Sequence, residues 1–239
     1  MFKRYNKFVN IPVTGRHQQE EASMIRGAIF DMDGLLLDSE CIWQKGWYEI
    51  AGEMGISLPD TFTSEVCGTS GPQMETVIRR SYRVDDPRPI MASCQERVYR
   101  YEEEGVPLKP GAEEILSGMK SSGLLLAVGS SSPIEMIRKN LEKAGILTYF
   151  DVLTSGREAA HPKPAPDIFL LAAKKLGLSP EECYVFEDSP SGVEAGCRAG
   201  CVTVMIPDMV KPTDEVRARC SGIYPSLSDA WRAINDNKL

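Results

Sequence analysis

Short apolar runs alternate with helix-like segments along most of this 239-residue chain, and this alternation is the feature that most constrains its fold. Five runs have the composition of buried strands: residues 28–30, 124–128, 152–153, 184–186 and 202–206. The segments between the later runs have helical composition: residues 134–144, 165–176 and 192–199. Strands that alternate with helices predict a parallel sheet covered on both faces. In such a sheet, functional side chains gather where the strands end at the carboxyl edge.

One long region interrupts the alternation. From about Glu40 to Leu108 no convincing buried strand is present, whereas residues 42–54, 73–82 and 89–104 have helical patterns. A helical insertion after the first strand predicts a separate cap. We therefore expect three parts: an N-terminal extension at residues 1–23, a Rossmann-like α/β core at residues 24–39 and 109–239, and an inserted α-helical cap domain at residues 40–108.

Composition argues against several classes of function. The formal net charge is −7, so the chain has no basic excess with which to neutralise a nucleic-acid backbone. No apolar run approaches the length of a membrane span, and residues 1–23 lack the apolar core of a secretory signal. The seven cysteines are scattered without a CxxC pair, which favours reduced thiols in a cytoplasmic protein.

The most informative motif follows the first apolar run. Asp31 ends that run directly, Asp33 comes two positions later, and Gly34 follows. Side chains on a continuing strand alternate between faces, but a glycine lets the chain turn so that both carboxylates can face one site. Asp31 can then serve as a nucleophile and Asp33 as a proton donor and acceptor. The ordinary alternative is a turn with two solvated aspartates.

The second motif closes the second apolar run. Ser130 and Ser131 precede Pro133 and a predicted helix. Serine is a good N-cap, proline suits the first helical turn, and free backbone N–H groups at such a helix start can bind a phosphate. Taken alone, this stretch could equally be a simple helix cap.

Two further motifs carry charge. Lys163 precedes the helix predicted from residue 165, and Glu187 and Asp188 end the fourth apolar run. A lysine can offset the repulsion between a carboxylate and a phosphate, and paired acids supply the hard oxygen ligands that Mg²⁺ prefers. The alternatives are a solvated lysine in a proline-rich turn and acids at a helix N-terminus.

Together, the four motifs resemble those of phosphatases of the haloacid dehalogenase superfamily, in the same order and from about Arg26 to the end of the chain. The resemblance implies a Mg²⁺-dependent phosphatase that acts on a small phosphorylated metabolite through an aspartyl-phosphate intermediate, as a cytoplasmic monomer. The stretches 30–40 and 204–208 look like those of pseudouridine-5′-phosphatase-like and sugar-phosphate phosphatases.

The resemblance also implies roles for individual residues. Asp31 is the nucleophile, and Asp33 exchanges protons with the leaving group and with water. The metal ligands are Asp31, the backbone carbonyl of Asp33, Asp188 directly and Glu187 through water. The phosphate-binding group comprises Gly34, Ser130, Ser131 and Lys163, and the cap loop that touches the substrate comprises Gly68, Thr69 and Ser70.

Alternatives within the superfamily are separated by single residues. Enzymes that cleave carbon–halogen or phosphonate bonds lack the second aspartate, so Asp33 argues against both. The runner-up is a sugar phosphomutase of the β-phosphoglucomutase type, which uses a histidine after the first motif and a lysine and an arginine in a cap loop. Residues 41–43 contain no histidine, and residues 67–71 contain neither lysine nor arginine. Simple hydrolysis is therefore favoured over phosphoryl transfer between sugars.

Two features of the cap leave alternatives open. Residues 68–70 lie where family members touch the leaving group, but a plain interhelical turn has the same composition. Trp43 and Trp47 are four positions apart on one helix face, for which core packing is the default and a substrate-facing Trp43 is the sharper option. A contrasting class is a non-catalytic binding protein, which should have lost at least one of Asp31, Asp33, Lys163 or Asp188. None is lost.

Overall fold

The computed structural model describes residues 24–67, 69 and 71–239, so the predicted N-terminal extension lies outside the described residues. In chain order the strands and α-helices are β1 (Gly27–Phe30), α1 (Ser39–Glu53), α2 (Phe62–Val66), α3 (Gly71–Tyr82), α4 (Arg88–Glu104), α5 (Ala112–Ser121), β2 (Leu125–Ser130), α6 (Ile134–Lys143), β3 (Val152–Ser155), α7 (Asp167–Leu176), β4 (Cys183–Glu187), α8 (Pro190–Ala199), β5 (Val202–Met205), α9 (Asp214–Arg219), β6 (Gly222–Ile223) and α10 (Leu227–Asn235). Three short 3₁₀ helices are added at Leu147–Tyr149, Pro180–Glu182 and Gly156–Glu158. None of the described helices is both long enough and apolar enough to cross a membrane.

The strands form one six-stranded sheet in the order β3-β2-β1-β4-β5-β6, and every pairing is parallel. The predicted Rossmann-like α/β fold and its five predicted strands are confirmed, while the two-residue β6 was not predicted. The chain leaves β1 toward β2 on one side and returns to β4 on the other. The strand order therefore reverses at β1, and ligands of open α/β sheets bind at such a reversal.

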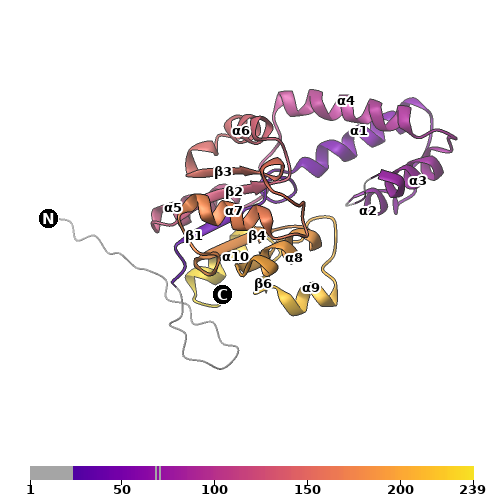
Figure 1. The fold of residues 1–239 in the computed structure, drawn as a ribbon. Coiled ribbons are helices and arrows are strands. Elements are labelled where there is room, and N and C mark those ends of the chain that lie inside the picture. The colour runs from indigo at the N-terminus through magenta and orange to yellow at the C-terminus, as the bar shows by residue number, and fades with distance from the viewer. Residues whose placement is uncertain (1–23, 68, 70) are drawn as a thin grey trace.

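Helices cover both faces of the sheet (Figure 1). Helices α5, α6 and α10 pack on one face, and α7 and α8 pack on the other. On the first face the rings of Phe30 and Phe186, which are register partners on β1 and β4, stack with centroids 4.8 Å apart. Both side chains are fully buried, and burial of each contributes about 2–3 kcal/mol. This packing fixes the ends of the two strands from which Asp31 and Glu187 emerge.

The predicted helical insertion is present between β1 and α5. Helices α1–α4 form a group of their own beside the sheet, with α4 lying along α1 (Figure 1). Its centre is a buried aromatic cluster of Trp47, Phe62 and Tyr82, in which the Tyr82 hydroxyl donates to the Trp47 carbonyl at 2.6 Å. The short helix α2 was not predicted, and the exact boundaries of the cap domain remain a prediction.

Two linkers join the cap to the core, and they pair with each other. Asp38 N–H donates to the Pro107 carbonyl at 2.8 Å, and Lys109 N–H donates to the Leu36 carbonyl at 2.9 Å. The Lys109 ammonium also contacts Asp38 at 3.4 Å and Asp208 at 2.6 Å. These contacts hold the first turn of α1 next to the end of β1 and to the loop after β5.

Candidate active site

The end of β1 carries the two aspartates of the first motif. Asp31 N–H still donates to the Phe186 carbonyl at 3.0 Å, so Asp31 is held as an extension of the strand. Gly34 then adopts φ +81°, a conformation that side-chain-bearing residues rarely adopt. The chain turns as expected, and both Asp31 and Asp33 line one cavity.

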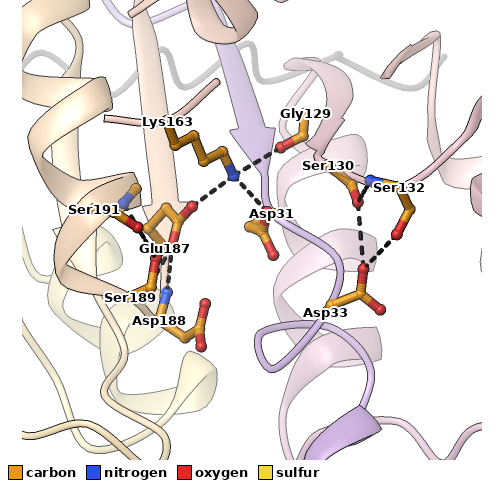
Figure 2. Close-up of polar contacts among 11 residues, drawn as sticks. Asp31, Asp33, Gly129, Ser130, Ser132, Lys163, Glu187, Asp188, Ser189 and Ser191 are labelled. Atoms are coloured by element: carbon orange, nitrogen blue, oxygen red, sulfur yellow. Dashed lines mark hydrogen bonds and ion pairs between the residues drawn. The ribbon is translucent and has the colours of Figure 1, made fainter. Parts of the chain in front are cut away.

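Lys163 lies between two acidic side chains (Figure 2). Its ammonium contacts Asp31 Oδ1 at 2.5 Å and Glu187 Oε1 at 2.6 Å, and it donates to the Gly129 carbonyl at 3.1 Å. All three charged side chains are at least nine-tenths buried. Burial lowers the pKa of Lys163, but the adjacent carboxylates of Asp31 and Glu187 outweigh it and raise that pKa, so the amine stays charged.

Both carboxylate oxygens of Glu187 already have hydrogen-bond partners. Its Oε2 accepts hydrogen bonds from the N–H groups of Asp188 and Ser189 and from the Ser189 hydroxyl, each at 3.0 Å. Its Oε1 accepts from Lys163. Glu187 therefore anchors the lysine and the start of α8, and its oxygens are already engaged.

Asp33 is held by two serines at the end of β2, Ser130 and Ser132 (Figure 2). The Ser132 hydroxyl donates to Asp33 Oδ2 at 2.9 Å, and the Ser130 hydroxyl lies 3.4 Å from the same oxygen. Burial raises the pKa of Asp33, and the two serine hydrogen bonds partly oppose this. A carboxyl group with a raised pKa is suited to carry a proton.

The expected serine cap of the following helix is wrong. Pro133 itself occupies the N-cap position of α6, and no side chain caps that helix. The Ser132 N–H instead donates to Ser130 Oγ at 3.1 Å, and the Ser132 hydroxyl is used by Asp33. The serines thus organise the first motif rather than the helix. Ser132 was missed because its partner lies 99 positions away in the sequence.

Three carboxyl groups could together hold a cation. Oxygens of Asp31, Glu187 and Asp188 lie within 4.8 Å of one another. Because the Glu187 oxygens already accept several hydrogen bonds, Asp31 and Asp188 are the side chains better placed to bind a metal directly. Burial and then the neighbouring carboxylates raise the pKa of Asp188 well above its ordinary range. Such an excess of negative charge fits a hard divalent cation.

The pKa of Asp31 reflects the same crowding. Burial raises it to about 7, Lys163 opposes that rise, and Glu187 and Asp33 add to it. A cation beside Asp31 would favour its ionised form.

Gly34, which was predicted to bind phosphate, lies next to the carboxyl group of Asp188 and does not line the cavity that contains Asp31 and Asp33.

The site opens into a cavity of about 320 Å³, here called the active-site cavity. The predicted residues that line it are Asp31, Asp33, Ser130, Ser131, Lys163, Glu187 and Asp188. Other lining residues were not predicted, among them Glu40 from α1, Cys67 from the cap loop, and Asp208 from the loop after β5. The approach of these loops depends on the cap and on the sheet order, which motifs do not reveal.

A second cavity of about 300 Å³ lies in the helical insertion and is here called the cap cavity. Trp43 and Thr69 line it, while Gly68 and Ser70 fall outside the described residues. The Thr69 hydroxyl donates to the Val66 carbonyl at 2.7 Å. Thr69 thus lines the cap cavity, and its contact with the leaving group stays a prediction.

Comparison with known proteins identifies the class. The family model described as "Haloacid dehalogenase-like hydrolase" matches residues 28–206. The chain therefore belongs to the haloacid dehalogenase-like hydrolases, and the predicted family and enzyme class are confirmed.

Two relatives and one solved structure illustrate the range of similar proteins. Hexitol phosphatase B from Escherichia coli (strain K12) is 31% identical over 188 residues, which cover 77% of this chain and 84% of that protein. A Drosophila melanogaster protein named "Probable pseudouridine-5'-phosphatase" is 30% identical over 207 residues, covering 84% of this chain and 89% of that one. The crystal structure of β-phosphoglucomutase from Clostridium difficile superposes with a TM-score of 0.65, 23% identity and coverage of 90% and 97%. At that identity the likeness extends to the fold alone.

Proposed function

We propose that this protein is a Mg²⁺-dependent phosphatase that hydrolyses a small phosphorylated metabolite through a phosphorylated Asp31. One observation carries the proposal. The carboxylate of Asp31 lies 2.5 Å from a buried ammonium and shares one cavity with Asp33, Ser130 and Asp188. A nucleophile, a proton carrier, a hydroxyl for phosphate oxygens and acids for a metal are thus available at one place.

The first step is attack by an Asp31 oxygen on phosphorus. A P–O bond forms to Asp31 while the P–O bond to the leaving alcohol breaks, and Asp33 gives its proton to the departing alkoxide. Lys163 offsets the repulsion between the carboxylate and the phosphoryl group. Ser130 and neighbouring N–H groups hold the phosphoryl oxygens in line.

The second step returns the enzyme to its starting state. Asp33, now ionised, takes a proton from water as the water oxygen attacks phosphorus. The bond between phosphorus and Asp31 breaks, and inorganic phosphate leaves. Asp33 thereby carries the proton in both steps, which agrees with its two serine hydrogen bonds and its raised pKa.

A bound Mg²⁺ would be held by Asp31, Asp188 and the backbone carbonyl of Asp33, with water in the remaining positions. It would supply positive charge to the phosphoryl oxygens. Glu187 would act indirectly, because its hydrogen bonds fix Lys163 and the loop that carries Asp188.

The phosphomutase alternative has less support. A mutase must bind a substrate with two phosphates, and the described residues that line the cap cavity include no lysine, arginine or histidine. A non-catalytic binding protein is also disfavoured, because the buried contacts of Asp31, Asp33 and Lys163 are complete.

The proposal is tested by measuring phosphate release from phosphorylated sugars, polyols and nucleosides with and without Mg²⁺. The Asp31→Asn variant should lose turnover while it stays folded, because an amide is a very poor nucleophile. Asp86→Asn, at an exposed ion pair with Arg88, is the matched control. Borohydride reduction of enzyme quenched during turnover should convert phosphorylated Asp31 to homoserine with release of phosphate, which peptide mass spectrometry detects. Normal turnover by Asp31→Asn would refute the nucleophile.

A further inference from the structure

The active-site cavity and the cap cavity meet at two residues. Glu40 and Cys67 line both of them. The Cys67 thiol donates to Glu40 Oε2 at 3.1 Å, which fixes the carboxyl group at the junction. A substrate with its phosphate beside Asp31 would extend past Glu40 into the cap cavity. Glu40 is therefore placed to contact the part of the substrate that leaves.

Positive charge is confined to the phosphate end of this path. Lys163 is the one basic side chain among the described residues that line either cavity, and it is held between Asp31 and Glu187. Lys109, which lies nearby, contacts Asp208 and Asp38. A second phosphate or a carboxylate on the substrate would meet carboxyl groups and no free cation, an arrangement that rejects like charge.

The cap cavity has the surface expected for a neutral, hydroxyl-rich group. The half-buried Trp43 packs against Trp47 with ring centroids 6.2 Å apart, so its position is fixed. The Gln44 amide lines the same cavity and its nitrogen contacts Met209 Sδ at 3.6 Å. An apolar wall with a few placed polar groups is typical of small-ligand sites, and about 300 Å³ is at their lower limit. A sugar or polyol can be accommodated in a space of that size.

We propose that Glu40 is a specificity-determining residue that hydrogen-bonds the hydroxyl groups of a sugar or polyol monophosphate and disfavours substrates with a second anionic group. This inference rests on the phosphatase function proposed above. Trp43 supplies the apolar wall beside the carbon chain. Burial raises the pKa of Glu40, with the Cys67 hydrogen bond opposing the rise. In either protonation state the carboxyl group can bond an alcohol.

The test compares kcat/KM for five substrates with the full-length protein and Mg²⁺. They are sorbitol 6-phosphate, fructose 1,6-bisphosphate, phosphoglycolate, uridine 5′-monophosphate and p-nitrophenyl phosphate. We expect kcat/KM for sorbitol 6-phosphate to exceed the values for the bisphosphate and phosphoglycolate by about 100-fold, because like charges that face each other disfavour binding by a few kcal/mol. Glu40→Gln should lower the ratio of kcat/KM for sorbitol 6-phosphate to that for p-nitrophenyl phosphate by about 10-fold. It should also reduce the difference in kcat/KM between sorbitol 6-phosphate and fructose 1,6-bisphosphate.

The matched control is Glu49→Gln, on the same helix. Glu49 contacts Arg97 at 3.3 Å and the Tyr101 hydroxyl, and it lines neither cavity. Its substitution should leave the substrate ratio unchanged. Thermal melting checks that both variants are folded, and the ranking of substrates by the unaltered protein needs no variant.

The outcomes separate the two proposals. No phosphate release from any substrate would refute the phosphatase function, and the inference about Glu40 would fall with it. Release from p-nitrophenyl phosphate with a preference for the bisphosphate, phosphoglycolate or the nucleotide would overturn only the inference. A ratio that Glu40→Gln leaves unchanged, or that Glu49→Gln lowers equally, would also overturn it.

Discussion

A β-carbon placed on Gly34 would lie 2.6 Å from Oδ2 of Asp188, although the two residues are 154 positions apart in the sequence. The turn after the first motif and the carboxyl group of the fourth motif therefore occupy adjoining space. Gly34 is required twice, once for its φ of +81° and once for this close approach. A side chain at residue 34 would therefore displace the carboxyl group of Asp188 from its present position.

Gly34→Ala should therefore harm metal binding more than it harms folding. The left-handed backbone costs about 1–2 kcal/mol of unfolding free energy for a residue with a side chain. Displacement of Asp188 should weaken Mg²⁺ affinity by about 10-fold or more, as measured by Mg²⁺ titration of activity. Gly55→Ala is the control, since Gly55 has φ +66° but nothing near its β-carbon position. Equal Mg²⁺ affinities for the two variants would contradict the role of the close approach.

The meeting of the four motifs could be predicted because parallel strands end at one edge of a sheet. Asp31, Ser130 and Asp188 each follow a buried apolar run, and those runs became β1, β2 and β4 as expected. The free thiols were also predictable from spacing, and all seven cysteines are unpaired. Each of these site residues could be predicted because it lies at or directly after the end of an apolar strand.

Long-range hydrogen bonds could not be predicted. Glu187 contacts Lys163, which lies 24 positions away, and its water-mediated contact with a metal stays a prediction. Helix α5, by contrast, could have been found, because Ala112, Ile115, Leu116 and Met119 follow helical spacing. Strand β6 has two residues and no pattern to detect.

The stability of the metal-free protein should fall as pH rises, and Asp31 is one cause. Burial raises the pKa of Asp31 from 3.8 to about 7. Between these two values the folded state holds a proton that the unfolded state has released, so stability declines with pH across this window. Melting temperatures in EDTA should fall from pH 5.5 to pH 7.5 with a smaller slope for Asp31→Asn, because in this range the acids with lowered pKa values are ionised in both states.

Mg²⁺ should reverse part of this effect, because it binds the ionised carboxylate. Its stabilisation of the unaltered protein should be larger at pH 8 than at pH 5, measured as the shift in melting temperature at fixed Mg²⁺. Asp31→Asn should show little shift at either pH. An Asp31→Asn variant that keeps the full pH slope in EDTA would show that other buried acids dominate.

Removal of the buried ammonium should cost both stability and rate. Lys163→Met leaves the carboxyl groups of Asp31 and Glu187 without their counter-charge in a buried position. We expect a loss of about 3 kcal/mol at pH 8, and a smaller loss at pH 5, where protonation relieves the uncompensated charge. The rate constant kcat should fall by about 100- to 1,000-fold.

Lys120→Met provides the comparison for that variant. Lys120 contacts Asp151 at 2.6 Å, but both side chains are about one-third exposed, and such surface pairs contribute about 1 kcal/mol or less. Chemical denaturation of both variants at the two pH values measures the difference. A Lys163→Met protein as stable as Lys120→Met at pH 8 would show that the buried acids are protonated without the lysine.

Asp33 and Ser132 should be separable by kinetics although they share a hydrogen bond. Asp33→Asn removes the proton carrier, so both formation and hydrolysis of the phosphorylated Asp31 should slow, with kcat lower by about 100- to 10,000-fold. Ser132→Ala removes only the 2.9 Å hydrogen bond that orients Asp33. It should therefore lower kcat by about 10-fold. That bond also lowers the pKa of Asp33. Ser132→Ala should therefore raise this pKa and shift the part of the pH dependence of kcat that reflects Asp33 to higher pH. Rapid-quench measurement of phosphorylated enzyme together with a pH series distinguishes the two. If Ser132→Ala lowered kcat without shifting its pH dependence, the serine would only orient Asp33. If Asp33→Asn left the pH dependence of kcat unchanged, Asp33 would not be the group that transfers the proton.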